Sequence, residues 1–382
     1  MENNVLLIFG GNSFEHDISI ITALTIYNRS KACKYNLLPL YLSKNNEWFL
    51  FCGKNFSVEN FKNFELSYKN NFKKAYFKNG KNLFYKSGLF EKKISFCSVL
   101  NCCHGGNGEN GEVTAFFNQL NIPITSGSYV AQTIGIDKII SKYYFSKINL
   151  PVIKSVEFNK SDFNKNQEKI MKKIKKINYP VIIKPASLGS SIGIEIAKNE
   201  SELLERLYVA FEFDENVLVE KAILDNLREF NVACLYYNGE VIVSEIDEPK
   251  RTDEILSFKD KYIGEGGIST KNSSNKTGSY FYSKLKEISL NEEVKNNIKQ
   301  NAKKIYEKLN CIGPVRVDFL MDKNENLFVN EINTVPGSLA YYFFIPSIFK
   351  TMNDYVEALV DESIKFFNNK NKIKKEFITK LI

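Results

Sequence analysis

Short apolar runs alternate with amphipathic segments in the first third of the chain. An apolar run at 5–9 precedes a glycine turn, and a helical pattern then extends from Asp17 to Tyr27. A second strand pattern ends at Leu42, and a third, at 95–103, leads into the turn HGGNGENG. Strands, turns and helices repeated in this order predict a doubly wound parallel sheet, with its loops gathered at the carboxyl ends of the strands.

The patterns of the whole chain predict an α/β and α+β protein of three domains. We expect an N-terminal α/β substrate domain at 1–135, a small central domain with antiparallel strands at 136–225, and a C-terminal domain at 226–382. Short polar and aromatic runs at 44–93 predict a hairpin-rich insertion in the first domain. The polar stretch at 250–280 lacks periodicity, which is typical of an active-site lid or of a disordered loop.

The charge balance is basic and bears on the class of partner. The chain of 382 residues carries a formal net charge of +8, mostly from lysines scattered among asparagines. A nucleic-acid surface is one interpretation, but solvated lysine faces are favoured because no RNA- or DNA-binding motif accompanies the charge. We therefore expect no nucleic-acid partner. A basic balance also suits a protein that handles anionic small molecules.

The cysteines, histidines and apolar runs argue against a disulfide-bonded, a zinc-binding or a membrane protein. The seven cysteines form no CxxC pair, and several lie in apolar strand patterns, so reduced, buried thiols are expected. With only two histidines, a zinc site is not expected. The apolar runs are too short for a transmembrane helix, which needs about 20 residues. The first residues contain neither a basic leader nor a cleavage site, so we expect a cytoplasmic protein without membrane attachment.

Two glycine-containing segments are candidates for substrate binding. In the first, GGNS follows a strand, and Glu15 in the first turn of the next helix could hold a substrate ammonium there. An ordinary tight turn is the alternative, and the segment is not a dinucleotide-binding GxGxxG. In the second, VIIKPASLGSSIGI, Lys184 ends a strand before a turn of glycines and serines, which favours phosphate binding. A hairpin with a surface lysine is the alternative.

Two neighbouring strand patterns near the C-terminus carry acidic residues among apolar ones. RVDFLMD has Arg316 and Asp318 on one face, and NEIN has Glu331 and Asn333 on one face. Two carboxylates and one amide oxygen form a hard oxygen set, suited to magnesium bound to nucleotide phosphates. A structural salt-bridge ladder is the alternative to this metal site.

The order of these motifs resembles the D-alanine–D-alanine ligase family. The segments that carry the resemblance span most of the chain: GGNSFEHDIS, HGGNGENG, SGSYVAQTIGIDK, VIIKPASLGSSIG, DKY, RVDF and NEINTVPGS. The resemblance implies the ATP-grasp fold and the ATP-dependent ligation of two D-alanine molecules through an acyl phosphate, releasing ADP and phosphate, for peptidoglycan synthesis. It also implies ATP and Mg²⁺ or Mn²⁺ at the site, and a homodimer.

The resemblance further implies roles for individual residues. A closed-lid network and an oxyanion-binding pair make up the implied catalytic set, which is Glu15, Ser190, Tyr262, Arg316 and Gly337. The implied substrate-binding residues are Glu15, His104, Arg316, Gly337 and Ser338. Those implied to bind ATP are Lys138, Lys184, Glu220, Lys221, Ile223, Glu229 and Lys261, and those implied to bind the metal are Asp318, Glu331 and Asn333.

Some positions depart from the family pattern. Leu188 stands where glutamate is common, Thr114 stands where glutamine is common, and the segment SLAYYFFIP after Gly337 borders the implied second-substrate pocket. D-serine or another amino acid as substrate, or a catalytically silent ATP-binding regulatory protein, therefore remain alternatives. The retained metal ligands, Arg316 and Tyr262 favour an active ligase of D-alanine.

Overall fold

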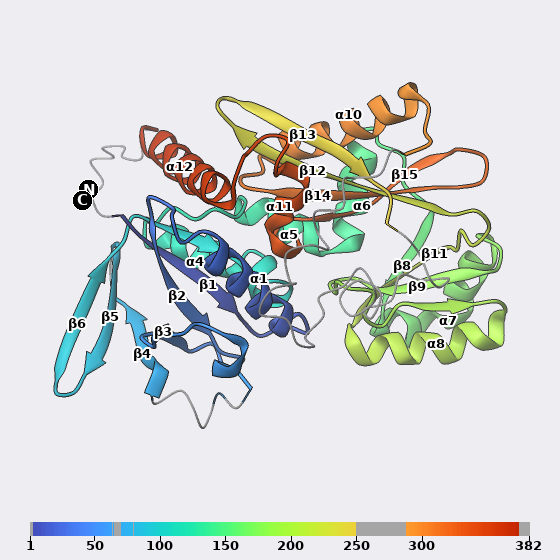
Figure 1. Cartoon of the computed structure of the whole chain (residues 1–382). Helices are drawn as coiled ribbons and strands as arrows, with labels where there is room; N and C mark the ends of the chain where they lie inside the picture. Colours follow the sequence, from blue (N-terminus) through green and yellow to red (C-terminus); the bar gives the residue numbers. More distant parts are fainter. Residues whose placement is uncertain (1–2, 63, 65–69, 79, 250–287, 374–382) are drawn as a thin grey trace, which may run out of the picture.

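Three β-sheets with helices packed around them form the molecule. The computed structural model describes residues 3–62, 64, 70–78, 80–249 and 288–373. Figure 1 shows the N-terminal sheet on the left, the central sheet on the right and the C-terminal sheet above them.

The N-terminal sheet has seven strands in the order β6-β5-β4-β3-β2-β1-β7. Their bounds are β1 (Asn4–Gly10), β2 (Asn36–Leu42), β3 (Trp48–Phe51), β4 (Phe72–Phe77), β5 (Asn82–Ser87), β6 (Phe90–Ser95) and β7 (Ser98–Asn101). The neighbours β2, β1 and β7 are parallel, and β3 to β6 continue the sheet as an antiparallel meander. The stretch at 44–93 is thus rich in hairpins, and it adds antiparallel strands to the sheet beside β2.

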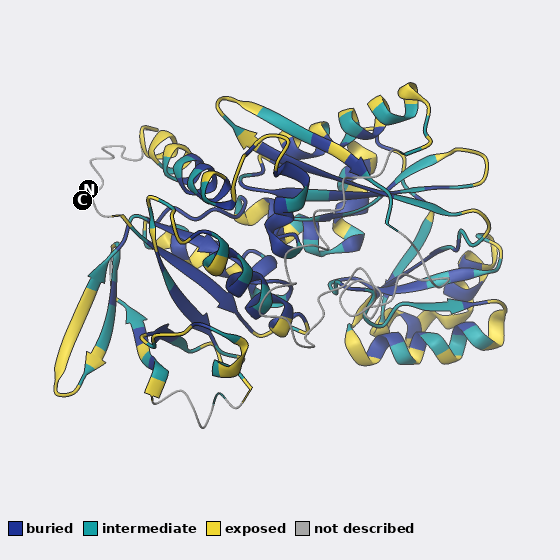
Figure 2. Cartoon of the chain, in the orientation of Figure 1, coloured by how far each residue is buried: buried dark blue, intermediate teal, exposed yellow. Residues whose placement is uncertain are grey.

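Strand β1 is buried on both faces. Val5, Leu7 and Phe9 pack in one apolar cluster, with α1 (His16–Arg29), whereas Leu6 and Ile8 pack in another, with α4 (Glu112–Gln119). Alternate residues of a strand point to opposite faces, so a continuous apolar run is what a strand covered on both sides requires. Figure 2 shows this inner sheet buried, in contrast with the exposed hairpin of β5 and β6.

The central sheet is antiparallel throughout, in the order β10-β9-β11-β8. Its elements are β8 (Ser155–Asn159), α7 (Lys160–Lys175), β9 (Val181–Pro185), β10 (Glu195–Ala197), α8 (Glu200–Phe213) and β11 (Asn216–Lys221). Helices α7 and α8 supply the apolar side chains that cover one face of this sheet, and the resulting cluster contains no residue from the other two sheets.

The C-terminal sheet is also antiparallel, in the order β13-β12-β14-β15. The elements of this part are β12 (Arg228–Tyr237), β13 (Glu240–Asp247), α10 (Glu292–Lys308), β14 (Val315–Met321), β15 (Leu327–Asn333), η2 (Gly337–Ala340), α11 (Tyr341–Phe344) and α12 (Met352–Asn371). None of the helices in the described ranges combines the length and the apolar character that crossing a bilayer requires.

Helices α5 (Tyr129–Ile136) and α6 (Lys138–Lys147) pack on the C-terminal sheet. Ala131 of α5 and Phe145 of α6 belong to the same apolar cluster as β12 and β14. The domain boundary expected between residues 135 and 136 therefore lies within a pair of helices that share one core.

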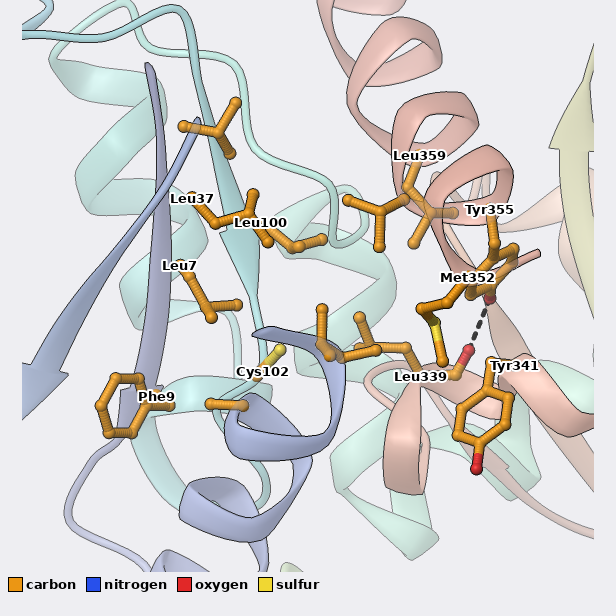
Figure 3. Packing of buried hydrophobic residues seen from close by; sticks show 14 of the residues in the cluster. Leu7, Phe9, Leu37, Leu100, Cys102, Leu339, Tyr341, Met352, Tyr355 and Leu359 are labelled. Carbon is orange, nitrogen blue, oxygen red and sulfur yellow. Dashed lines mark hydrogen bonds between the residues drawn. The ribbon is translucent and has the colours of Figure 1, made fainter. Parts of the chain in front are cut away.

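The last helix returns to the first sheet. Leu359 and Met352 of α12 share an apolar cluster with Leu7 of β1 and Leu100 of β7. Figure 3 shows these side chains meeting between the two parts of the chain, with the hydroxyl of Tyr355 donating to the carbonyl of Leu339 at 2.5 Å. The N-terminal sheet and the segment after β15 are therefore parts of one core.

Candidate active site

A cleft lies between the central sheet and the C-terminal sheet. Strands β9, β10 and β11 form one wall, and β12, β14 and β15 contribute to the other. The cleft is concave and open to solvent, and small-molecule sites are common at such junctions between two parts of a chain. Apolar side chains, among them Ile182, Ile196 and Leu320, line one region, and charged groups line the rest. The cleft can therefore accept a flat ring together with an anionic group.

Most of the residues expected to bind ATP line this cleft. They are Lys138, Lys184, Glu220, Lys221, Ile223 and Glu229, and Glu331 of the expected metal set joins them. Lys221 also donates from Nζ to the carbonyl of Tyr179 at 2.9 Å, which ties the edge of the cleft to the start of β9. Lys261, the remaining member of the expected ATP set, lies outside the described residues.

A buried carboxylate between two lysines forms the charged part of the cleft. Nζ of Lys184 donates to Oε2 of Glu220 at 2.9 Å and to Oδ1 of Asn330 at 3.1 Å, and Nζ of Lys142 lies 2.7 Å from Oε1 of Glu220. Burial opposes the charge on Glu220, but the two lysines outweigh it and lower the pKa of the carboxyl group. Lys184 is only 6% exposed, so the alternative of a surface lysine is wrong. Lys184 lines the cleft and can contact a phosphate directly, whereas Lys142 lies outside the lining and balances the charge of Glu220.

The glycine- and serine-containing turn after β9 is tied down beside the cleft. Lys138, at the start of α6, donates from Nζ to the carbonyl of Leu188 and from its backbone N–H to Ala186 at 2.9 Å. Ser190 and Ser191 have φ angles of 53° and 61°, which non-glycine residues adopt only where neighbouring contacts hold them. The turn is thus held in a fixed shape in which its N–H groups and hydroxyls can approach phosphate oxygens.

Glu15 links the first domain to this turn. It directly precedes α1, yet its side chain makes no capping bond. Its carboxylate instead accepts a hydrogen bond from the hydroxyl of Ser190. A Cβ on Gly105 or Gly189 would lie 2.6 Å or 2.9 Å from Oε2 of Glu15, so a larger residue at either position would displace the carboxylate. Two members of the expected network are together, and the third, Tyr262, lies outside the described residues.

The strand pair β14–β15 presents a ladder of polar side chains. Arg316 holds Asp318 at two points, with Nε 2.7 Å from Oδ1 and a terminal nitrogen 2.8 Å from Oδ2. Asn333 donates from Nδ2 to Oδ2 of Asp318 at 3.1 Å, and Glu331 lies opposite Asp318 in the strand register. The salt-bridge alternative is therefore present in the structure, within the residues expected to bind a metal.

The same residues fit a magnesium ion by their chemistry. Because Asn333 uses its amide nitrogen on Asp318, its oxygen is the atom available to a cation. Asp318 and Glu331 add carboxylate oxygens, which magnesium prefers. In the described part of the chain, no three or more His, Cys, Asp or Glu side chains gather to hold a metal, so a site here depends on two carboxylates and one amide.

His104 is buried, and both of its ring nitrogens contact protein groups. Nδ1 lies 2.7 Å from the carbonyl oxygen of Val335, and Nε2 lies 2.8 Å from the hydroxyl oxygen of Thr22. Burial lowers the pKa of His104, although the charge of Glu15 opposes this. Because a carbonyl only accepts hydrogen bonds, the neutral ring carries its proton on Nδ1. His104 thus supports the turn that leads to Gly337.

Glu109 supports the same turn from a second side. Its Oε1 accepts the backbone N–H groups of Thr334 and Val335 at 3.0 and 3.1 Å, and its Oε2 accepts that of Gly105 at 3.1 Å. Burial, together with the negative charge of Glu15, raises the pKa of Glu109 to about 7. The turn after β15 and the turn after β7 are therefore joined through one carboxyl group.

Sequence reasoning did not single out four residues of this site: Thr22, Glu109, Lys142 and Asn330. For Lys142 a signal was available, because it follows Lys138 by four positions and so lies on the same face of the helix. Glu109 stands among glycines in HGGNGENG, where an acid has little structural use unless it binds backbone N–H groups. Thr22 and Asn330 carry no comparable local signal.

Comparison with known proteins agrees with this arrangement. The family models described as "D-ala D-ala ligase N-terminus" and "D-ala D-ala ligase C-terminus" match residues 4–128 and 144–365. A D-alanine–D-alanine ligase from Thermosipho africanus is 35% identical over 96% of this chain and 95% of its own length.

Solved structures are similar over nearly the whole chain. A D-alanine–D-alanine ligase from Helicobacter pylori has a TM-score of 0.73 at 26% identity, covering 94% of this chain and 98% of that one. A D-Ala:D-Ser ligase from Enterococcus faecalis has a TM-score of 0.74 at 25% identity, covering 96% and 99%. The fold is therefore ATP-grasp, as the sequence predicted, and the chain belongs to the D-alanine–D-alanine ligase family.

Proposed function

We propose that this chain joins two D-alanine molecules into D-Ala–D-Ala at the expense of ATP, releasing ADP and phosphate, and so supplies a precursor of peptidoglycan. The observation that carries the proposal is the contact between Glu15 and Ser190, which brings an amine-binding carboxylate against the turn of the nucleotide cleft. Family membership supports the substrate and the use of ATP.

The first step transfers the γ-phosphoryl group of ATP to the carboxylate of the first D-alanine. The apolar walls of the cleft receive adenine, and Lys138 and Lys184 neutralise the phosphates. Glu15 holds the ammonium group of the first D-alanine, so that its carboxylate reaches the turn around Ser190. Catalysis of this step depends mainly on position and charge, because the enzyme makes no covalent bond of its own.

The second step forms the peptide bond. The amine of the second D-alanine, after losing a proton, attacks the carbonyl carbon of the acyl phosphate, and phosphate leaves as the C–O bond breaks. Arg316 and the backbone N–H of Gly337 stabilise the oxyanion of the tetrahedral intermediate. One such donor typically contributes about 3–4 kcal/mol to the transition state. Exclusion of water from the closed site protects the acyl phosphate from hydrolysis.

Asp318, Glu331 and Asn333 would hold Mg²⁺ or Mn²⁺ in this enzyme. When bound there, the metal supplies positive charge beside the phosphates of ATP. Asp318 also fixes the Arg316 guanidinium through two hydrogen bonds, so one carboxylate serves both the metal site and the oxyanion site.

Location and assembly extend the proposal. ATP and the peptidoglycan precursors that this reaction feeds are cytoplasmic, which supports a cytoplasmic enzyme. The family resemblance supports a homodimer, which light scattering coupled to gel filtration tests directly.

The reaction itself is tested by supplying ATP and magnesium with D-alanine alone, and then with D-alanine plus D-serine or D-lactate. Released phosphate is measured, and products are identified by mass. D-Ala–D-Ala from D-alanine alone is the expected result. A mixed product in preference to D-Ala–D-Ala, or ATP binding without phosphate release, would refute D-alanine as the second substrate or catalysis itself.

A further inference from the structure

A turn of left-handed residues follows Gly337. Ser338, Leu339 and Ala340 have φ angles of 53°, 52° and 52°, a conformation that side chains disfavour. Such a backbone persists where surrounding groups hold it in place. Gly337 directly precedes these residues, so the position of its N–H group depends on what holds the turn.

Thr22 of α1 holds the turn through its hydroxyl group. This oxygen is fully buried and lies 3.2 Å from the backbone nitrogen of Ser338 and 2.8 Å from Nε2 of His104. Because Nδ1 of His104 faces the carbonyl of Val335 and carries the ring proton, Nε2 is an acceptor. The hydroxyl of Thr22 therefore donates to His104 and accepts from Ser338.

We propose that Thr22 is a positioning residue for ligation, whose single hydroxyl fixes both ends of the turn at 335–338 and so aims the Gly337 N–H at the reacting carboxyl group. The inference rests on the proposed function. The same helix begins directly after Glu15, so α1 positions the group that holds the ammonium and also anchors the oxyanion donor. The Gly337 N–H would contact the oxyanion, whose charge forms only in the transition state. Losing its alignment should therefore lower kcat far more than it changes KM.

Three variants separate this role from general stability. Thr22→Val removes the hydroxyl with little change in volume and leaves two buried polar groups, Nε2 of His104 and the N–H of Ser338, without their partner. Thr22→Ser keeps the hydroxyl. Thr25→Val is the matched control. The Thr25 hydroxyl lies on the same helix and donates to the carbonyl of Ile21 at 2.9 Å, its one hydrogen bond among the described residues.

Steady-state rates are expressed per ATP-binding site, counted by calorimetry, so that unfolded protein does not contribute. For Thr22→Val we expect kcat to fall about tenfold or more, with KM for D-alanine and ATP within about twofold of the unmodified enzyme. Thr22→Ser and Thr25→Val should stay within about threefold in kcat. A Thr22→Val enzyme within that threefold range, or a Thr22→Ser enzyme as slow as Thr22→Val, overturns the proposal. Should Thr22→Val bind no ATP, Thr22→Ala is judged by the same limits.

Amide hydrogen exchange provides a measurement that does not depend on the substrate. Exchange in peptides covering 335–341 should be faster in Thr22→Val than in Thr25→Val, and equal exchange overturns the anchoring role. If the unmodified enzyme forms no D-Ala–D-Ala, the proposed function fails, while the exchange result still decides whether Thr22 holds the turn.

Discussion

The hydroxyl of Ser190 donates a hydrogen bond to the carboxylate of Glu15, although 175 residues separate the two in the chain. This contact joins the start of α1 to the glycine- and serine-containing turn that follows β9 of the central sheet. In the proposed reaction, it couples the position of the first D-alanine to the closure of the nucleotide cleft.

Removal of the hydroxyl in Ser190→Ala should lower kcat/KM for D-alanine. We expect a decrease of about tenfold or more, since a hydrogen bond to a charged group contributes about 1.5–3 kcal/mol. Initial rates of ADP release provide the measurement. Ser161→Ala is the control, because Ser161 is exposed on α7 and its hydroxyl makes no hydrogen bond within the described residues. Equal rates in Ser190→Ala and Ser161→Ala would count against the coupling.

The two lysines on Glu220 should have separable effects. Lys142→Met should lower the free energy of unfolding by about 3 kcal/mol, because it leaves the buried charge of Glu220 poorly paired. Because Lys142 does not line the cleft, the affinity of the folded fraction for ATP should change little. Chemical denaturation measures the first quantity and calorimetry the second. Lys147→Met, on the exposed side of the same helix, is the stability control. A large loss of ATP affinity in folded Lys142→Met would instead place Lys142 in the phosphate site.

Glu331→Gln should raise the magnesium concentration needed for half-maximal activity. Loss of one carboxylate oxygen from a hard-oxygen site weakens metal binding, and we expect a shift of about tenfold or more. Activity titrated with magnesium at saturating ATP gives the value. Glu325→Gln, in the exposed turn between the same two strands, serves as control, and an unaltered magnesium requirement in Glu331→Gln would remove Glu331 from the ligand set.

Glu109 should make stability depend on pH. Its pKa of about 7 is above the ordinary value of 4.5, so the folded state holds this proton more tightly than the unfolded chain does. The stabilisation is complete below pH 4.5 and is lost as the pH rises through 7. Relative to Glu109→Gln, the unmodified protein should therefore lose about 3 kcal/mol of unfolding free energy over this interval. Urea unfolding at several pH values measures the difference, and a difference constant with pH would contradict the prediction.

Apolar patterning predicts the strands that carry the site. The run ending in Lys184 is β9, and the runs around Asp318 and Glu331 are β14 and β15. Patterning succeeds here because strands buried among helices must be apolar, which makes each charged residue within them conspicuous. Of the residues carried over from the family resemblance, seven accordingly line one cleft: Lys138, Lys184, Glu220, Lys221, Ile223, Glu229 and Glu331.

Contacts between distant turns are not predictable in this way. The hydroxyl of Thr22 meets the backbone of Ser338 across 316 residues, and no periodicity around either position encodes that pairing. Similarly, the apolar stripe of α12 predicts a buried helix, but the stripe alone does not identify β1 and β7 as its partners. Tertiary packing decides such contacts, and local sequence limits them only weakly.

The core shared by α12 and the N-terminal sheet has a mechanical consequence. The first and last parts of the chain share an apolar cluster, and the described apolar cluster of the central sheet includes no residue from either part. We therefore expect two bodies to move relative to one another rather than three. Opening the cleft would break polar links such as Glu15–Ser190, Lys184–Asn330 and Lys142–Glu220, and the ring contact of Phe14 with Phe213. The central domain can thus swing as a unit during each catalytic cycle, whereas a truncation before α12 would expose the hydrophobic interior of the larger body.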